Sequence, residues 1–254
     1  MKIALIQAPL VWENPKANRD YFEEKIKSVS DEIDLVILPE MFSTGFTMNS
    51  SEVFETMDGE TISLLKKLAK AKNLAITGSL IIKENDMFYN RLVFVFPSGE
   101  IKKYDKRHLF SLAGEEKIYT SGTEKLIVEY KGWKICPLVC YDLRFPVFSR
   151  NVEEYDLLIY VANWPTQRIQ AWNILLKARA VENICYTIGV NRIGEDGNDH
   201  PYSGNSQVVD FLGNSLLEPQ LSEGIFTVEL DKNKMLETRE KLGFLNDKDL
   251  FSLL

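Results

Sequence analysis

The sequence has few histidines, few cysteines and no long apolar run, and each scarcity excludes a class of protein. His108 and His200 are the only histidines, and neither has ligand-like spacing to a cysteine or to the other, so no metal site is expected. The three cysteines, Cys136, Cys140 and Cys185, lack the number and spacing of a disulfide framework. Cys136 and Cys140 are also too far apart along a strand to form a redox pair. A reducing compartment is therefore predicted.

Membrane and nucleic-acid partners are excluded on similar grounds. No apolar stretch approaches the roughly 18 residues of a membrane-spanning helix, and the first residues lack the pattern of a secretory signal. The net charge is −7, and Lys and Arg are interspersed with Asp and Glu, so there is no basic stripe. We expect a cytoplasmic protein with a small-molecule partner, bound to neither nucleic acid nor membrane.

The pattern of apolar residues predicts an α/β fold. The chain has 254 residues, 45% of them hydrophobic, and no linker-like segment, so residues 1–254 are expected to form one domain. Helical periodicity appears at residues 18–30, 61–71 and 168–182. Runs rich in β-branched and aromatic residues predict buried strands at 3–8, 35–38, 74–82, 92–96, 133–139, 157–162, 186–190 and 225–230.

Two regions depart from simple alternation of strands and helices. Residues 74–96 and 207–230 each read as consecutive strands joined by polar turns, which predicts a mixed sheet or two packed sheets. The tail, from about residue 237 to 254, is more apolar than a free terminus and is expected to pack on the domain or on a partner subunit. Its apolar residues include Phe244, Leu245, Leu250, Phe251, Leu253 and Leu254.

Two charged residues have the surroundings of a reactive site. Glu40 directly follows the apolar run 35–39, where open α/β sheets place their ligands, although a helix-capping or surface glutamate is the commoner case. The apolar residues after it would desolvate the carboxyl and raise its pKa toward that of a useful base. Lys106 lies in an aperiodic charged segment that by default is a solvated loop. A lysine can nevertheless hold a developing oxyanion in a dry pocket.

Cys140 is the sharpest signal in the sequence. It stands where the predicted strand 133–139 meets the abrupt polar turn 140–146, which is the placement of a nucleophile that must be exposed at a strand end. The backbone N–H of Tyr141 would then face the oxyanion. Cys136 and Cys185 lie inside apolar runs and are better interpreted as buried structural residues. A carboxylate base is more economical than a Cys–His dyad, because neither histidine is placed beside Cys140.

Three segments, in order, resemble the signature motifs of the nitrilase, or carbon-nitrogen hydrolase, superfamily: Leu-Pro-Glu-Met-Phe at 38–42, Tyr-Asp-Lys-Arg-His-Leu-Phe at 104–110 and Val-Cys-Tyr-Asp-Leu-Arg-Phe-Pro at 139–146. The resemblance implies a four-layer α-β-β-α sandwich, usually paired into homodimers through outer helices. It also implies that Glu40 is the base, Lys106 the stabilising lysine and Cys140 the nucleophile, with no cofactor. A further glutamate often lies between the last two motifs, and here Glu115 is preferred over Glu116.

Within this superfamily, the motifs are most similar to the ω-amidases, which hydrolyse 2-oxoglutaramate and 2-oxosuccinamate. The implied reaction converts a small amide to a carboxylate and ammonia through a cysteine thioester. Arg144 and Arg168 are candidate partners for the substrate carboxylate, and Phe46 and Trp164 are candidate apolar walls. Alternatives are an amidase, carbamoylase or acyltransferase with another substrate range, or a non-catalytic scaffold protein.

Overall fold

The computed structural model describes residues 1–249 and 251–252 and contains two six-stranded sheets. The first sheet has the order β14-β1-β2-β3-β4-β5, and the second has the order β13-β12-β9-β8-β7-β6. In each, three parallel strands form the centre and antiparallel strands form the edges. The strands of the first sheet are β1 (Lys2–Gln7), β2 (Leu35–Ile37), β3 (Ala75–Glu84), β4 (Met87–Val95), β5 (Ile101–Asp105) and β14 (Gly224–Glu229). Those of the second are β6 (Val128–Tyr130), β7 (Trp133–Val139), β8 (Leu157–Ala162), β9 (Tyr186–Asn191), β12 (Ser206–Val209) and β13 (Ser215–Gln220).

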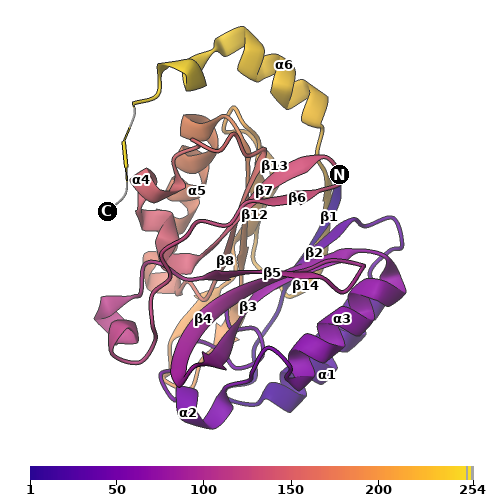
Figure 1. The fold of residues 1–254 in the computed structure, drawn as a ribbon, viewed down its shortest axis with the longest axis vertical. Helices are drawn as coiled ribbons and strands as arrows, with labels where there is room; N and C mark the ends of the chain where they lie inside the picture. Colours follow the sequence, from indigo (N-terminus) through magenta and orange to yellow (C-terminus); the bar gives the residue numbers. More distant parts are fainter. Residues whose placement is uncertain (250, 253–254) are drawn as a thin grey trace.

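The helices lie outside the two sheets. Figure 1 shows α1 and α3 on one side of the sandwich and α4 and α5 on the other. A short hairpin of β10 (Ile193–Glu195) and β11 (Pro201–Ser203) stands apart from both sheets. The helices are α1 (Pro15–Ser28), α2 (Ser50–Val53), α3 (Glu60–Lys72), α4 (Pro146–Ser149), α5 (Ile169–Asn183) and α6 (Lys232–Leu242). None of the helices in the described part of the chain is long and apolar enough to cross a membrane.

Alternation along buried strands explains the layering. In β1, Ile3 and Leu5 face the core between the sheets, whereas Ala4 and Ile6 belong to the apolar cluster under α1 and α3. A strand covered on both faces is apolar throughout, which explains the continuous runs in the sequence. On the opposite side, a Cβ at Gly189 of β9 would lie 2.5 Å from the side chains of Trp172 and Leu176, so glycine lets α5 approach the sheet closely. The expected four-layer α-β-β-α sandwich is confirmed.

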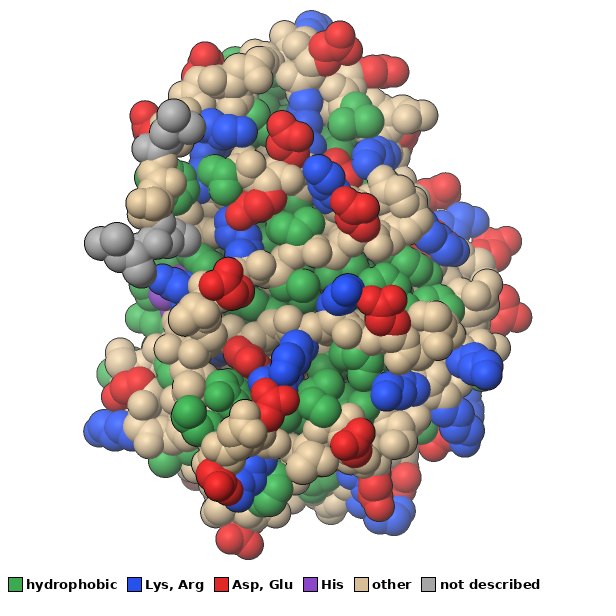
Figure 2. All heavy atoms as spheres, in the orientation of Figure 1, with side chains coloured by type: hydrophobic (Ala, Val, Ile, Leu, Met, Phe, Trp, Pro, Cys, Tyr) green, Lys and Arg blue, Asp and Glu red, His purple; other side chains and the backbone are tan. Residues whose placement is uncertain are grey.

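Several short elements differ from the sequence-based expectation. Helix α1 begins at Pro15, because proline suits the first helical position and Asn14 caps the helix by accepting from the Ala17 N–H at 3.1 Å. Strand β5 was not predicted, since it is an edge strand whose two central lysines are exposed. Helix α6 was also missed, because Met235 is its one buried residue. On the face in Figure 2, acidic and basic side chains are interspersed.

The C-terminal segment lies across one end of the sandwich (Figure 1). Met235 is buried, and Leu242 and Leu245 pack against the apolar cluster that both sheets share. Arg239 donates to the Tyr155 and Ile184 carbonyls and pairs with Asp156 at 3.3 Å. Phe244 and Phe251 are exposed. Leu250, Leu253 and Leu254, which contributed to the expected packing of this tail, lie outside the described residues.

Candidate active site

The ends of several strands converge on one group of buried polar side chains. Glu40 follows β2, and Lys106 directly follows β5, both in the first sheet. Cys140 directly follows β7, and Asn163 follows β8, both in the second sheet. The carboxyl ends of these strands meet at one edge of the sandwich, which is where α/β proteins place their sites. The site is therefore assembled across the two sheets.

Glu40 is fully buried, and donors from both sheets hold its carboxylate. Oε1 accepts from Asn90 Nδ2 at 2.8 Å and from Lys106 Nζ at 2.9 Å, whereas Oε2 accepts from the Asn163 N–H at 2.8 Å. The Asn163 side chain also donates to the Glu40 carbonyl at 2.6 Å. The turn that follows is anchored because the Met41 N–H donates to Ser79 Oγ at 2.9 Å. The carboxylate is thus fixed in one orientation.

Lys106 is buried, not solvated as its sequence surroundings suggest by default. Its Nζ lies 2.9 Å from Glu40 Oε1 and 3.0 and 2.9 Å from the two carboxylate oxygens of Glu115. Burial alone would lower the lysine pKa, but attraction to Glu115 and Glu40 outweighs it and raises the pKa above its usual value. Nζ also lies 5.2 Å from the centre of the Phe46 ring. Lys106 is therefore a fixed cation.

Glu115, and not Glu116, joins this cluster. Its Oε1 accepts from Asn90 Nδ2 at 3.2 Å, and its Oε2 accepts from the Phe110 N–H at 2.6 Å. Burial raises the pKa of its carboxyl, against the lowering effect of Lys106. Glu116, the next residue of the same short 3-10 helix, is exposed. Two buried carboxylates therefore share a single ammonium group.

Cys140 occupies a strained turn at the floor of the pocket. Its φ of +42° is uncommon for a residue with a side chain, and it begins a 3-10 helix, Cys140–Arg144. Sγ lies 4.0 Å from the Asn163 carbonyl oxygen. Burial raises the pKa of the thiol, and the Glu40 carboxylate raises it further, so the resting group is a neutral thiol. The N–H of Tyr141, in the first turn of this helix, has no acceptor within the helix.

Asp142 holds the turn and also explains why His108 is not a base for Cys140. Its carboxylate accepts from the Val139 N–H at 3.0 Å, the His108 N–H at 3.1 Å and the Tyr104 hydroxyl at 2.7 Å. The His108 Nδ1 also lies 2.8 Å from this carboxylate, and its ring stacks on Phe145 at 3.7 Å. This histidine supports the turn. Cys136 and Cys185 are buried, in keeping with their apolar surroundings.

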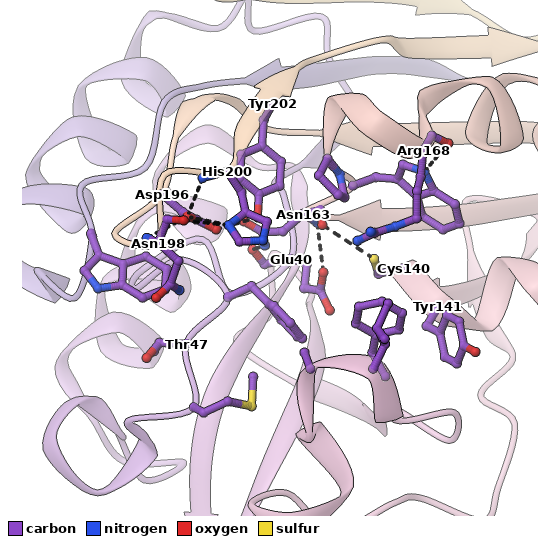
Figure 3. A pocket seen from close by; sticks show the side chains of 18 of the residues that line it. Glu40, Thr47, Cys140, Tyr141, Asn163, Arg168, Asp196, Asn198, His200 and Tyr202 are labelled. Atoms are coloured by element: carbon purple, nitrogen blue, oxygen red, sulfur yellow. Dashed lines mark hydrogen bonds and ion pairs between the residues drawn. The ribbon is translucent and has the colours of Figure 1, made fainter.

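A pocket of about 550 Å³ opens above Glu40, Lys106 and Cys140 (Figure 3). Every other residue suggested from the sequence as a contact for the substrate lines it, namely Phe46, Tyr141, Arg144, Trp164 and Arg168. Glu115 lies behind Lys106 and is not part of the lining. In the described part of the chain, no group of His, Cys, Asp or Glu side chains has the arrangement of a metal site.

Sequence reasoning missed other parts of this site. Asn90 and Asn163 received no role, although Asn163 belongs to the Ala-Asn-Trp-Pro motif at 162–165 and directly follows a predicted strand, which was an available signal. Other lining residues come from the segment after β1, from the loop between β2 and α2, and from the β10–β11 hairpin, and their polar residues gave no signal. These missed lining residues include Trp12, Glu13, Thr47, Asn49, Asp196, Asn198, His200 and Tyr202.

Comparison with known proteins agrees with this architecture. The omega-amidase YafV of Yersinia enterocolitica is 44% identical over 100% of this chain and 99% of its own length. The 2-oxoglutaramate amidase of Bacillus subtilis (strain 168) is 33% identical over 98% of each chain. The crystal structure of XC1258 from Xanthomonas campestris, a CN-hydrolase superfamily protein with an arsenic adduct in its active site, aligns with a TM-score of 0.97, at 42% identity over 100% of this chain and 98% of the other. The family profile described as carbon-nitrogen hydrolase matches residues 2–240, and this chain belongs to that family, within the nitrilase superfamily.

Proposed function

We propose that this protein hydrolyses the ω-amides of 2-oxo acids, such as 2-oxoglutaramate and 2-oxosuccinamate, to the dicarboxylate and ammonia. The observation that carries the proposal is the juxtaposition of Cys140 with the buried Glu40–Lys106–Glu115 cluster, in a pocket that also holds Arg144 and Arg168. Relatives that are similar to this chain over almost their full length carry the names omega-amidase and 2-oxoglutaramate amidase.

Glu40 begins the reaction as the general base. Because the Cys140 pKa is raised, the thiol is a weak nucleophile until a base removes its proton during attack. Glu40 lines the same pocket as this thiol, and its carboxylate is held by Asn90, Lys106 and Asn163. The thiolate adds to the amide carbon, and the carbonyl oxygen becomes negatively charged.

Lys106 and the Tyr141 N–H stabilise that oxyanion. Two of the three Lys106 contacts go to the same Glu115 carboxylate, so one N–H can turn to the substrate while both ion pairs persist. Glu115 has no proton-transfer step in this mechanism. It holds Lys106 in place and balances its charge in a dry cluster.

Glu40 then gives its proton to the leaving nitrogen, the C–N bond breaks, and ammonia departs. A water molecule, activated by the same carboxylate, attacks the thioester and restores the Cys140 thiol. One carboxyl that alternates between two protonation states thus serves both half-reactions. The residues of this chain supply every step, so the proposal requires no cofactor.

Two arginines account for the preference for an acid amide. Arg144 lies 5.0 Å from the Trp164 ring centre, and Arg168 lies 5.1 Å from that of Phe110. Within the described residues, neither arginine forms an ion pair with a carboxylate. Their guanidinium groups therefore remain available to the carboxylate of the substrate, which arginine binds with two parallel hydrogen bonds.

The direct test is ammonia release from 2-oxoglutaramate by the wild-type protein and by Cys140→Ala. We expect turnover by the wild type and none by the variant, while circular dichroism shows an unchanged fold. The matched control is Cys136→Ala, which makes the same substitution four residues earlier and outside the pocket lining, and which should remain active. Retention of one tenth of the activity by Cys140→Ala would exclude Cys140 as the nucleophile. Turnover of only a nitrile or an N-carbamoyl amino acid would exclude the ω-amidase assignment.

We also propose that the chain is a single cytoplasmic domain that pairs into a homodimer. All three cysteines are free thiols, as suits a reducing compartment, and one apolar core is shared by both sheets. Ile174 and Val181 on the outer helix α5 are apolar and exposed. Light scattering on the purified protein would give the mass of the assembly, and a monomer at micromolar concentration would contradict the pairing.

A further inference from the structure

The pocket has two arms of different chemistry. The arginine arm is lined by Phe110, Tyr141, Arg144, Trp164 and Arg168, and the acidic arm by Trp12, Glu13, Thr47, Asn49, Asp196 and Asn198. In Figure 3, the labelled residues Thr47, Asp196 and Asn198 lie on the opposite side of Glu40 from Cys140, Tyr141 and Arg168. A volume of about 550 Å³ lies in the range of pockets that hold drug-sized ligands, so a five-carbon acid amide leaves one arm empty.

Glu13 is the distinctive residue of the acidic arm. Its carboxylate accepts from the Thr47 hydroxyl and, at 3.3 Å, from Asn49 Nδ2, both of which are neutral donors. No basic side chain in the described part of the chain forms an ion pair with it. Its backbone has a φ of +50° and is held there because the Glu13 N–H donates to the Thr44 carbonyl at 2.8 Å. An unpaired carboxylate is thus positioned at the pocket wall by a strained backbone, as is common at functional sites.

Asp196, the second carboxylate of this arm, is already satisfied by its own loop. It accepts from the Asn198 and His200 N–H groups at 2.8 and 3.1 Å and from the Tyr202 hydroxyl at 2.8 Å. The His200 ring lies 3.6 Å from it, and the Arg192 guanidinium stacks on the Tyr202 ring at 4.6 Å. The charge of Asp196 is therefore shared among these donors, and Glu13 is the carboxylate of this arm that has no cationic partner among the described residues.

If the protein has the function proposed above, each arm of the pocket lies on one side of the amide bond that is broken. The acyl chain extends from Cys140 toward the arginines that bind its carboxylate. The leaving nitrogen must face Glu40, which protonates it. A substituent on that nitrogen consequently extends past Glu40 into the acidic arm. We propose that the acidic arm is a subsite for the leaving amine, which takes the N-substituent of a secondary amide and prefers an alkylammonium group bound by Glu13.

The chemistry of such a substrate is that of the primary amide. Cys140 sulfur bonds to the acyl carbon, the C–N bond breaks, and Glu40 gives the nitrogen the proton that it took from the thiol. A diamine leaves in place of ammonia, and water hydrolyses the thioester. No additional reactant is required.

The test compares two monoamides of glutaric acid, the N-butyl and the N-(4-aminobutyl) compound, which share an acyl group without a ketone to react with the amine. Calorimetry gives their affinities for Cys140→Ala, and mass spectrometry of the products gives kcat/KM for the wild type. We expect the cationic amide to bind more tightly and react faster by roughly tenfold, as for one charge-assisted hydrogen bond. Glu13→Gln should reduce this ratio to near one. Glu129→Gln, which removes an exposed charge on β6, should keep the wild-type ratio.

Two results would overturn the subsite. One is equal affinity of the two amides for Cys140→Ala, and the other is a cationic preference that survives Glu13→Gln. Because affinity is measured without turnover, either result is independent of hydrolysis. Turnover of 2-oxoglutaramate, assayed in parallel, tests the proposed function, so failure of one proposal is distinguishable from failure of the other.

Discussion

Lys106→Met should convert the centre of the site from a stabilising cluster into a destabilising one. Lys106 is buried, and its Nζ lies within 3.0 Å of three carboxylate oxygens that belong to Glu40 and Glu115. Methionine fills a similar volume but leaves the two carboxylates in contact with no cation between them. Removing one partner of a buried ion pair costs about 3–5 kcal/mol, a large part of the roughly 5–15 kcal/mol that stabilises a typical domain.

The loss should depend on pH, and its sign follows from the carboxylates. Without Lys106, nothing offsets burial and repulsion from Glu40, so the folded-state pKa of Glu115 lies further above the value of about 4.3 for an unfolded glutamate. The folded variant then binds more protons than the unfolded chain, so its free energy of unfolding falls as the pH rises through this raised pKa. Urea denaturation should therefore give a lower midpoint at pH 8 than at pH 6, with a larger difference than in the wild type.

Two further variants make this prediction specific. Lys103→Met, three residues earlier on β5, removes a half-exposed lysine that pairs with Glu84 at 3.1 Å, and it should cost at most about 1 kcal/mol. Lys106→Met/Glu115→Gln removes one of the two carboxylates that repel each other, so it should recover stability. It should not recover activity, because the oxyanion still lacks its cation. Equal midpoints at pH 6 and pH 8 for Lys106→Met, or no recovery in the double variant, would refute the reasoning.

Three other predictions concern binding, positioning and reactivity. Arg144→Lys replaces a planar donor of two parallel hydrogen bonds by a point charge, so KM for 2-oxoglutaramate should rise by roughly tenfold or more. KM for a neutral amide of similar length should be unaffected, and equal changes in the two KM values would exclude carboxylate binding by Arg144. Asn90→Ser removes a donor to Glu40 and Glu115 from a residue outside the pocket lining, so kcat should fall with little change in KM, and a pure KM effect would contradict this positioning role. In the folded protein, iodoacetamide should modify Cys140, which lines the pocket. Cys185, whose pKa burial raises to about 12, should react only after unfolding, as peptide mapping would reveal.

The sequence predicts the positions in this site that directly follow a strong strand. Glu40 and Cys140 stand where an apolar run ends, and that pattern is local. The surroundings of Lys106 are not local, because Glu40 lies 66 residues away in the sequence and the edge strand before Lys106 is too polar to recognise. Its motif reveals its importance, but its burial depends on contacts that no window of the sequence contains.

The same reasoning explains the omissions. Asn90 lies in the middle of β4, where a polar residue among apolar neighbours can equally face solvent at a sheet edge. The role of Asn90 in the site is to donate hydrogen bonds to two carboxylates, which come from different segments of the chain. The acidic arm combines the loop after β1, the loop between β2 and α2, and the β10–β11 hairpin, and only the tertiary fold brings these together. The periodicity of the sequence predicts the strands and where they end, but it does not predict which side chains contact one another in the folded protein.

The division of the site between the two sheets has a consequence for the folding of the chain. Glu40 is joined to Asn163 across 123 residues of sequence, and the strands of its sheet contain no cysteine. A nascent or partly unfolded chain in which the sheets have not docked therefore carries Cys140 without its base. Such a thiol has no activating partner and cannot turn over the amides of the surrounding solution. During refolding, catalysis should thus return later than strand and helix content, so that turnover itself reports the docking of one half of the sandwich onto the other.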